Sequence, residues 1–165
     1  MRYDPGFAPS EILINGIWGP CDSGETLELI DPSDGTPLAR IARGGAVDID
    51  RAVAAAGNAR AAQWGALSAT ERGRLLSHLA TLVLRDADRL AEMEARDVGK
   101  PLAQARADAL ALARYLEFYG GAADKIMGET IPYADGYTVY TLREPHGVTG
   151  HIVPWNYPMQ IIGRS

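Results

Sequence analysis

The architecture of this chain is most clearly indicated by the segment Gly147-Val148-Thr149-Gly150-His151-Ile152-Val153-Pro154-Trp155-Asn156-Tyr157-Pro158. The apolar run 148–153 is bounded by glycine and proline, which predicts a short strand. A strand that arrives after several helices indicates an α/β fold. The prolines at positions 154 and 158 restrict the backbone, so the residues between them are presented rigidly.

Asn156 is the candidate catalytic residue of this segment. In open α/β sheets, ligands bind beyond the carboxyl ends of the strands. The amide N–H₂ of an Asn there can donate to a developing oxyanion, which is worth about 3–4 kcal/mol in a water-excluded site. Alternatively, Asn156 caps or bridges a tight turn. Composition alone favours the turn role and leaves both open.

The N-terminal part of the chain has the pattern of short strands. Residues 11–18 are rich in Ile and Leu and contain Asn15-Gly16, and residues 26–30 form a second extended run. Turn residues at 19–24 lie between them, so the two runs predict a β-hairpin or meander. A turn over residues 31–35 leads to a further short strand over residues 38–42.

Helices are expected over the middle of the chain. Gly45 can cap a first helix, and Ser68 with Glu71 forms a capping box for a second helix. The second helix restarts near Asp86 and stops at Val98-Gly99. Pro101 suits the first position of a third helix, which we expect to end at Gly120-Gly121. The apolar positions at helical spacing are Ile49, Val53 and Ala56 in the first helix, and Leu75, Leu79, Leu82 and Val83 in the second.

From Gly128 the apolar pattern changes to a period of two. Residues 130–133 and 137–143 flank Ala134-Asp135-Gly136, which predicts a hairpin. Its Tyr, Thr and Val residues suit a surface for a partner or, equally, an ordinary edge hairpin.

A last helix begins near Pro158 and is cut off at Ser165. Parallel strands need neighbours and cover on both faces. We therefore expect this chain to be part of a longer protein, or to pack on another chain.

Composition narrows the class of protein. The net charge of −5 comes without a basic run, which argues against binding to nucleic acid or to anionic membranes. No apolar run is long enough to cross a bilayer, and the start at Met1–Pro5 lacks the apolar core of a signal peptide. With a single cysteine, Cys21, these features fit a cytoplasmic protein.

The other residues that could take part in catalysis or metal binding give weaker indications of function. Cys21 has no neighbouring base, and His78, His146 and His151 have no metal-ligand spacing, so no metal site is predicted. Glu92 and Glu94 are expected to solvate a charged helix face. The glycine-rich dinucleotide and phosphate-binding fingerprints are absent.

Several motifs together resemble the aldehyde dehydrogenase superfamily. They appear in the family's order and at about its spacing, from about residue 11 onward. They are Ile14-Asn15-Gly16, Asp31-Pro32-Ser33-Asp34-Gly35, Asp97-Val98-Gly99-Lys100-Pro101, Ala123-Asp124-Lys125, Gly128-Glu129-Thr130-Ile131-Pro132, Arg143-Glu144-Pro145-His146-Gly147-Val148 and Gly150–Pro158.

The resemblance implies oxidation of an aldehyde to a carboxylic acid with NAD or NADP. In this family a Cys thiolate attacks the aldehyde, hydride passes to the nicotinamide, and a Glu activates water to hydrolyse the thioester. Asn156 matches the Asn that stabilises the oxyanion, and Tyr157 matches an aromatic wall of the substrate tunnel. The cofactor-lining strand end is matched by Ile152, Val153, Pro154 and Trp155.

The resemblance also implies the fold: the N-terminal part of the aldehyde dehydrogenase fold, in which a Rossmann-like NAD(P)-binding domain begins. Residues 1–127 form its N-terminal strands and helices, residues 128–146 a hairpin that joins subunits of a homo-oligomer, and residues 147–165 the first strand and helix of the core. Tyr157 in place of Phe is also reminiscent of members that act on amino- or betaine-type aldehydes.

The catalytic Cys, the general-base Glu and the cofactor-binding Lys of the family all lie beyond position 165. We therefore expect residues 1–165 alone to be inactive. The alternative is a short, non-catalytic interaction module that joins dehydrogenase subunits through its hairpin.

Overall fold

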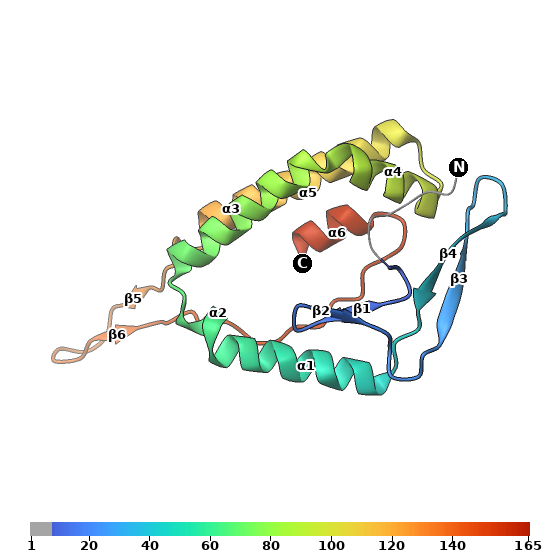
Figure 1. Cartoon of the computed structure of the whole chain (residues 1–165). Coiled ribbons are helices and arrows are strands. Elements are labelled where there is room, and N and C mark those ends of the chain that lie inside the picture. The colour runs from blue at the N-terminus through green and yellow to red at the C-terminus, as the bar shows by residue number, and fades with distance from the viewer. Residues whose placement is uncertain (1–7) are drawn as a thin grey trace.

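The packed centre of the molecule is helical. The computed structural model describes residues 8–165, and in it the long helices α3 (Ala69–Arg85) and α5 (Leu102–Ala122) lie side by side (Figure 1). Helices α4 (Ala87–Val98) and α6 (Pro158–Arg164) pack against α5. The small side chains of this core let the helix backbones approach closely. Its buried members are Ala80, Val83, Ala87, Ala109, Leu112, Ala113 and Met159.

Local capping chemistry sets the helix boundaries much as predicted. The Ser68 hydroxyl accepts from the Glu71 amide at 3.2 Å, and the Ser68 amide donates to the Glu71 carboxylate at 2.8 Å, which confirms the capping box. Gly99 ends α4 with φ of 76°, a conformation that glycine adopts without a steric penalty. Pro101 is the residue before α5 rather than its first residue, so that prediction was off by one position.

The predicted helix stop at Gly120-Gly121 is wrong, because α5 continues to Ala122. Tertiary packing explains why a glycine stands at position 120 inside the helix. A Cβ at Gly73 would lie 2.3 Å from the Gly120 carbonyl oxygen, and a Cβ at Gly120 would lie 2.8 Å from the Gly73 carbonyl oxygen. Gly120 is therefore required for contact between the backbones of α3 and α5 rather than for a turn.

Two small hairpins form the N-terminal part. Strand β1 (Ile12–Ile14) pairs with β2 (Ile17–Gly19) across Asn15-Gly16, whose φ angles of 54° and 76° suit a tight hairpin turn. Strand β3 (Thr26–Ile30) pairs with β4 (Pro37–Ala42), in a separate sheet. The prediction that the first two runs pair with each other is therefore wrong, whereas the strand at 38–42 is confirmed. Each strand pairs across its nearest turn.

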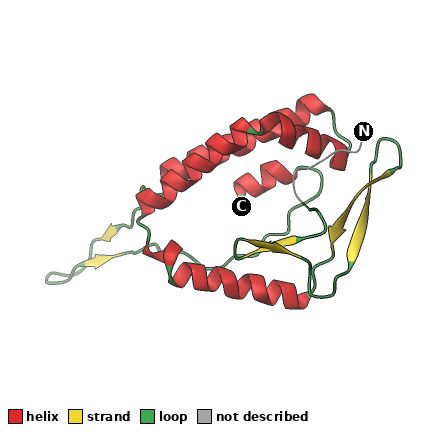
Figure 2. Ribbon diagram, viewed as in Figure 1, coloured by secondary structure: helices red, strands yellow, loops and turns green. Residues whose placement is uncertain are grey.

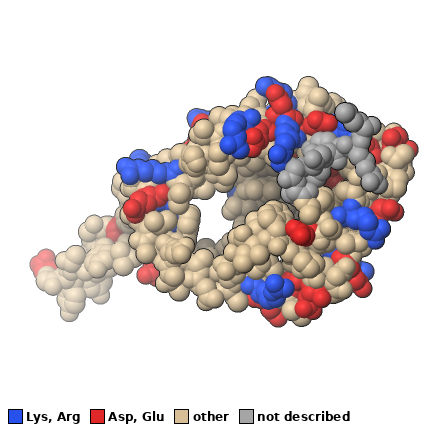
Figure 3. Space-filling view, in the orientation of Figure 1, with Lys and Arg blue, Asp and Glu red and all other residues tan. Residues whose placement is uncertain are grey.

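Helices α1 (Ala46–Ala61) and α2 (Gln63–Ala66) lie apart from the main helical layer (Figure 1). Asp48 in the first turn of α1 accepts from the Gly45 amide at 2.9 Å and from the Asp22 amide at 3.0 Å, which joins α1 to the β2–β3 loop. These hydrogen bonds, the one from Gly45 first, lower the pKa of Asp48. Figure 3 shows an opening between this layer and the α3–α5 layer, so the described residues form a ring rather than one closed core.

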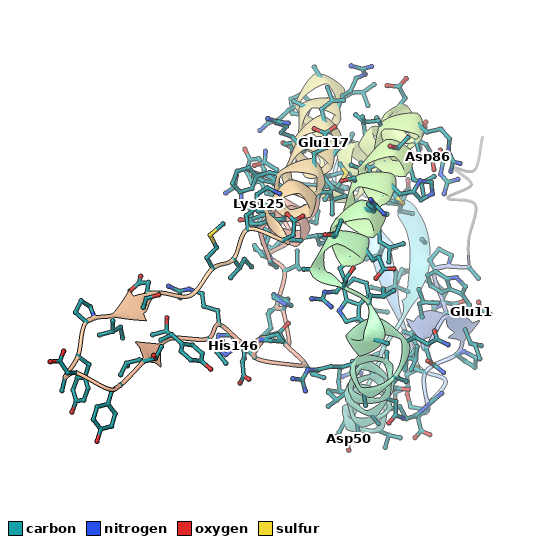
Figure 4. All side chains as sticks on the ribbon, turned by 90° about the vertical axis from the view of Figure 1, so that its left-hand side faces the viewer. Glu11, Asp50, Asp86, Glu117, Lys125 and His146 are labelled. Atoms are coloured by element: carbon teal, nitrogen blue, oxygen red, sulfur yellow. The ribbon has the colours of Figure 1, made fainter. Side chains whose placement is uncertain are left out.

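The predicted hairpin at 130–143 is confirmed but is shorter than expected. Only β5 (Thr130–Ile131) and β6 (Val139–Tyr140) are paired, in antiparallel register. The hairpin extends away from the body (Figure 1), and the labelled Lys125 and His146 mark the segments leading to and from it (Figure 4).

The predicted strand over residues 148–153 is not formed. The segment is drawn as loop (Figure 2) and has no strand partner within residues 8–165. An isolated strand has nothing to satisfy its backbone N–H and C=O groups, so it does not count as sheet. The helix expected near Pro158 is present as α6, and the mixed α/β composition agrees with the predicted class.

The start of the chain at Met1–Pro5, where no signal peptide is expected, lies outside the described residues. Among the helices that the structure does describe, none is both long and apolar enough to span a membrane.

Candidate functional site

Asn156 lies on the turn that leads into α6. Pro158 is the first residue of that helix, a position where its missing N–H needs no partner. The Tyr157 carbonyl accepts from the Ile161 amide at 3.0 Å and so begins the helix. Trp155 and Asn156 are both exposed. The two prolines and the helix thus present Asn156 on an ordered turn.

The side chain of Asn156 has no hydrogen-bond partner within residues 8–165. It does not cap α6, since Tyr157 occupies the N-cap position and no side chain bonds there. The alternative in which Asn156 bridges the turn therefore finds no support in the described contacts. Its amide N–H₂ is available to a ligand.

The residues on the other side of the turn present an apolar surface. Ile152 is fully exposed, Trp155 is 77% exposed, and Val153 is partly buried. Pro154 is also exposed. An exposed apolar strip therefore lies next to the Asn156 amide in the chain.

Tyr157 is held by two side chains. Gln104 Nε2 of α5 donates to the Tyr157 hydroxyl at 2.6 Å. Lys100 Nζ lies 4.2 Å from the centroid of the Tyr157 ring, a favourable cation–π distance. The ring is therefore fixed against the start of α5.

Lys100 belongs to a buried ionic cluster that sequence reasoning missed. Its ammonium donates to Glu94 of α4 and, at 2.7 Å, to Asp108 of α5. Gln160 of α6 donates to the other oxygen of Asp108 at 2.6 Å. Glu94 is buried, so the prediction that it solvates a helix face is wrong. The spacing of these residues alone does not predict the cluster, because it forms only where three helices meet.

The cluster perturbs the pKa values of all three charged groups. Burial raises the pKa of Glu94, against the opposing effect of Lys100. Burial also acts against ionisation of Asp108 and Lys100, but their hydrogen bonds outweigh it: the pKa of Asp108 is lowered and that of Lys100 is raised. The cluster thus favours the charged forms of Lys100 and Asp108 and disfavours the charged form of Glu94.

The other candidate side chains lie away from this turn. Cys21 is buried and bonds to the Glu25 carbonyl at 3.2 Å. His78, His146 and His151 are exposed. Within the described part of the chain, no group of three or more His, Cys, Asp or Glu is arranged to hold a metal ion.

Comparison with known proteins gives a consistent result. The model of the aldehyde dehydrogenase family matches residues 18–165. Over 157 residues the chain is 45% identical to a hydroxyisobutyraldehyde dehydrogenase of Mycolicibacterium austroafricanum, which covers 95% of this chain and 31% of that protein.

Solved structures agree with this similarity. A provisionally named aldehyde dehydrogenase of Burkholderia cenocepacia superposes with a TM-score of 0.90 at 66% identity, over 92% of this chain and 32% of the other. PnpE, solved with nicotinamide adenine dinucleotide, superposes with a TM-score of 0.89 at 39% identity, over 94% and 32%. The chain spans about a third of the length of these proteins.

Proposed function

The chain belongs to the aldehyde dehydrogenase family, and from this premise we propose that it forms part of an enzyme that oxidises an aldehyde to a carboxylic acid with NAD or NADP. Two lines of support are the aldehyde-oxidising names of the relatives and the nicotinamide dinucleotide in the PnpE structure. The catalytic Cys, the general-base Glu and the cofactor-binding Lys would come from sequence beyond residue 165.

Within this enzyme, Asn156 acts as the oxyanion donor. When a thiolate adds to the aldehyde carbon, a carbon–sulfur bond forms and the carbonyl π electrons move to oxygen. The amide N–H₂ of Asn156 donates to that oxygen and stabilises its charge, most strongly in the transition state. A bound nicotinamide supplies the hydride acceptor.

The observation that carries this proposal is the exposed amide of Asn156, which has no hydrogen-bond partner within residues 8–165, on a turn bounded by Pro154 and Pro158. A donor contributes most when it is already oriented, because no reorganisation is then needed during the reaction. We further propose that Ile152, Val153, Pro154 and Trp155 line the cofactor, and that the Tyr157 ring forms a wall of the substrate site.

The same proposal extends to the organisation of the enzyme. Residues 1–127 contribute strands and helices of the cofactor-binding domain, residues 147–165 begin its core, and the hairpin at 128–146 pairs with another subunit of a homo-oligomer. The exposed side chains of the hairpin suit such pairing: Tyr133, Tyr137, Tyr140 and Leu142. The single cysteine, Cys21, agrees with a cytoplasmic location.

The test compares Asn156→Ala with Asn58→Ala in the full-length protein that contains this chain. Asn58 is an exposed Asn on α1, remote from the turn, and serves as the matched control. Loss of an oxyanion donor should lower kcat by about 10²–10³-fold, and the control should be unchanged. An Asn156→Ala enzyme with unaltered kcat would remove Asn156 from the reaction.

The 165-residue chain alone should produce no reduced nicotinamide from an aliphatic or an aromatic aldehyde, because it has no nucleophile at the site. Turnover by the purified chain would overturn the proposal that the catalytic Cys and Glu come from sequence beyond residue 165.

A second candidate function rests on the projecting hairpin. Its exposed tyrosines would allow the chain to act as a short interaction module that extends the sheet of a dehydrogenase subunit. An intact-mass measurement on the native source separates the two: a mass of 165 residues, with co-purification of a full-length dehydrogenase, supports the module.

A further inference from the structure

The Lys100 cluster joins three helices, α4, α5 and α6, next to the turn that carries Asn156. Glu94 comes from α4, Lys100 from the α4–α5 loop, Asp108 from α5 and Gln160 from α6. The side chains of Lys100, Glu94 and Asp108 are 8%, 2% and 2% exposed. Burying so many charges is costly, and apolar replacements of buried ion pairs are often at least as stable. Stability alone is therefore a weak reason for this cluster.

Two arms of the cluster reach the turn itself. In the first arm, the Lys100 ammonium lies over the ring of Tyr157, the residue next to Asn156. In the second arm, Asp108 accepts from Gln160 in the first turn of α6. Gln104 adds a hydrogen bond to the Tyr157 hydroxyl. The backbone that follows Asn156 is thus fixed at residues 157 and 160, whereas the Asn156 side chain has no partner within residues 8–165 to orient it.

We propose that Lys100 is a positioning residue for the oxyanion donor. By holding the Tyr157 ring and, through Asp108, Gln160, it fixes the direction in which the turn presents the Asn156 amide. This inference rests on the proposed function of Asn156. A displacement of about 1 Å at a reacting group can cost about 10²-fold in rate, so a residue that never touches the substrate can control kcat in this way.

The test is a double-mutant cycle in the full-length protein that contains this chain. Lys100→Met removes the charge and both hydrogen bonds but keeps a similar length, and it should lower kcat by about 10- to 100-fold with a much smaller change in KM. Lys100→Arg keeps the charge and should restore part of the loss. Arg106→Met is the matched control, because Arg106 forms an exposed ion pair with Asp88 between the same two helices and does not reach the turn.

The decisive comparison is made in the Asn156→Ala background. If Lys100 acts through Asn156, Lys100→Met should cause little further loss of kcat there. A merely structural role would multiply the two losses, and multiplied losses would overturn the inference. An unchanged kcat in Lys100→Met would overturn it as well. If Asn156→Ala itself retains full kcat, the proposed function fails, and this inference fails with it.

Gln104→Leu provides a second variant in case Lys100→Met does not fold. It removes only the hydrogen bond to the Tyr157 hydroxyl and leaves the buried charges paired. We expect a smaller loss of kcat, about 3- to 10-fold, which again disappears in the Asn156→Ala background. Amide hydrogen exchange should become faster at Tyr157 and at residues 159–162, and should stay unchanged in α3. Unaltered exchange in that segment together with unaltered kcat would overturn the inference.

Discussion

The two sides of Asn156 are built very differently. On the C-terminal side, Tyr157 and Gln160 are fastened to α5 by hydrogen bonds and by the Lys100 ammonium. On the N-terminal side, residues 148–153 form no regular structure and have no strand partner in the described chain, and Ile152 is fully exposed. The C-terminal flank is thus held to α5 by side-chain hydrogen bonds, whereas residues 148–153 form no strand pairing within residues 8–165.

This difference teaches how the site is assembled. The orientation of the turn depends on helix packing that the chain completes by itself. The apolar strip from Ile152 to Trp155 has no strand partner within the described residues, and Ile152 and Trp155 are exposed there. Substitutions on the two sides of Asn156 should consequently differ in their effect on the folding of this chain.

The largest expected difference is between Leu112→Ala and Ile152→Ala. Leu112 is buried in the helical core against α6, so its truncation should lower the free energy of unfolding by about 2–5 kcal/mol. Ile152 has no buried surface to lose, and its truncation should change stability by less than about 0.5 kcal/mol. Urea unfolding of the 165-residue chain measures both. A similar loss for the two variants would contradict the comparison.

A smaller effect is expected where α3 and α5 touch. Gly73→Ala places a Cβ against the Gly120 carbonyl, which is backbone and cannot rotate away, so the helices must separate at a cost of about 1–3 kcal/mol. Gly121→Ala, in α5 next to Gly120, meets no atom within 4 Å and should be neutral or slightly stabilising, since alanine favours helix. Thermal unfolding of the two variants checks this, and a stable Gly73→Ala chain would show that the helices can shift apart at little cost.

The smallest expected effect is on the pH dependence of the free energy of unfolding. It should arise only on the C-terminal side of Asn156, where Asp108 contacts Gln160. The pKa of Asp108 is lowered in the folded chain, so its ionised form contributes stability above the ordinary Asp pKa of about 4. That contribution is lost as the pH falls through the lower folded pKa. The difference in unfolding free energy between the wild type and Asp108→Asn should therefore shrink below about pH 4.

Urea unfolding at a series of pH values measures this difference. The Ile152→Ala variant should follow the wild-type pH profile throughout, because it alters no ionisable contact. A difference between the wild type and Asp108→Asn that stays constant with pH would show that Asp108 is not ionised preferentially in the fold.

Helix starts and turns could be predicted from the sequence where residues close together in the chain specify them. Ser68 with Glu71 specifies a helix start within four residues, and it is found, whereas the turn at Asn15-Gly16 falls inside a run that was expected to form one extended segment. Gly120 and Glu94 were misjudged because their roles depend on helices that meet only in the folded chain. The strand at 148–153 was misjudged for a related reason: its pattern is that of a strand, but sheet needs a neighbour.

In the candidate site too, features that are local in the sequence could be predicted, whereas contacts between distant residues could not. The prediction for Asn156 rests on its place between two prolines and on the motifs around it, all of which are local in the sequence. Lys100 stands in a recognised motif, yet its contact with Tyr157 is 57 positions away in sequence and required the packing of α4, α5 and α6. Residue type and spacing cannot indicate such a contact.

The close approach of Gly73 and Gly120 has a consequence for α5. Two helices whose backbones touch cannot turn about their axes without collision, so the contact sets the rotational phase of α5. Along the face that this phase directs toward α6 lie residues spaced by three or four positions: Gln104, Asp108, Leu112 and Tyr115. Gly120 near the C-terminal end of α5 and Gly73 of α3 thereby limit the rotation of the helix whose N-terminal end contacts Tyr157.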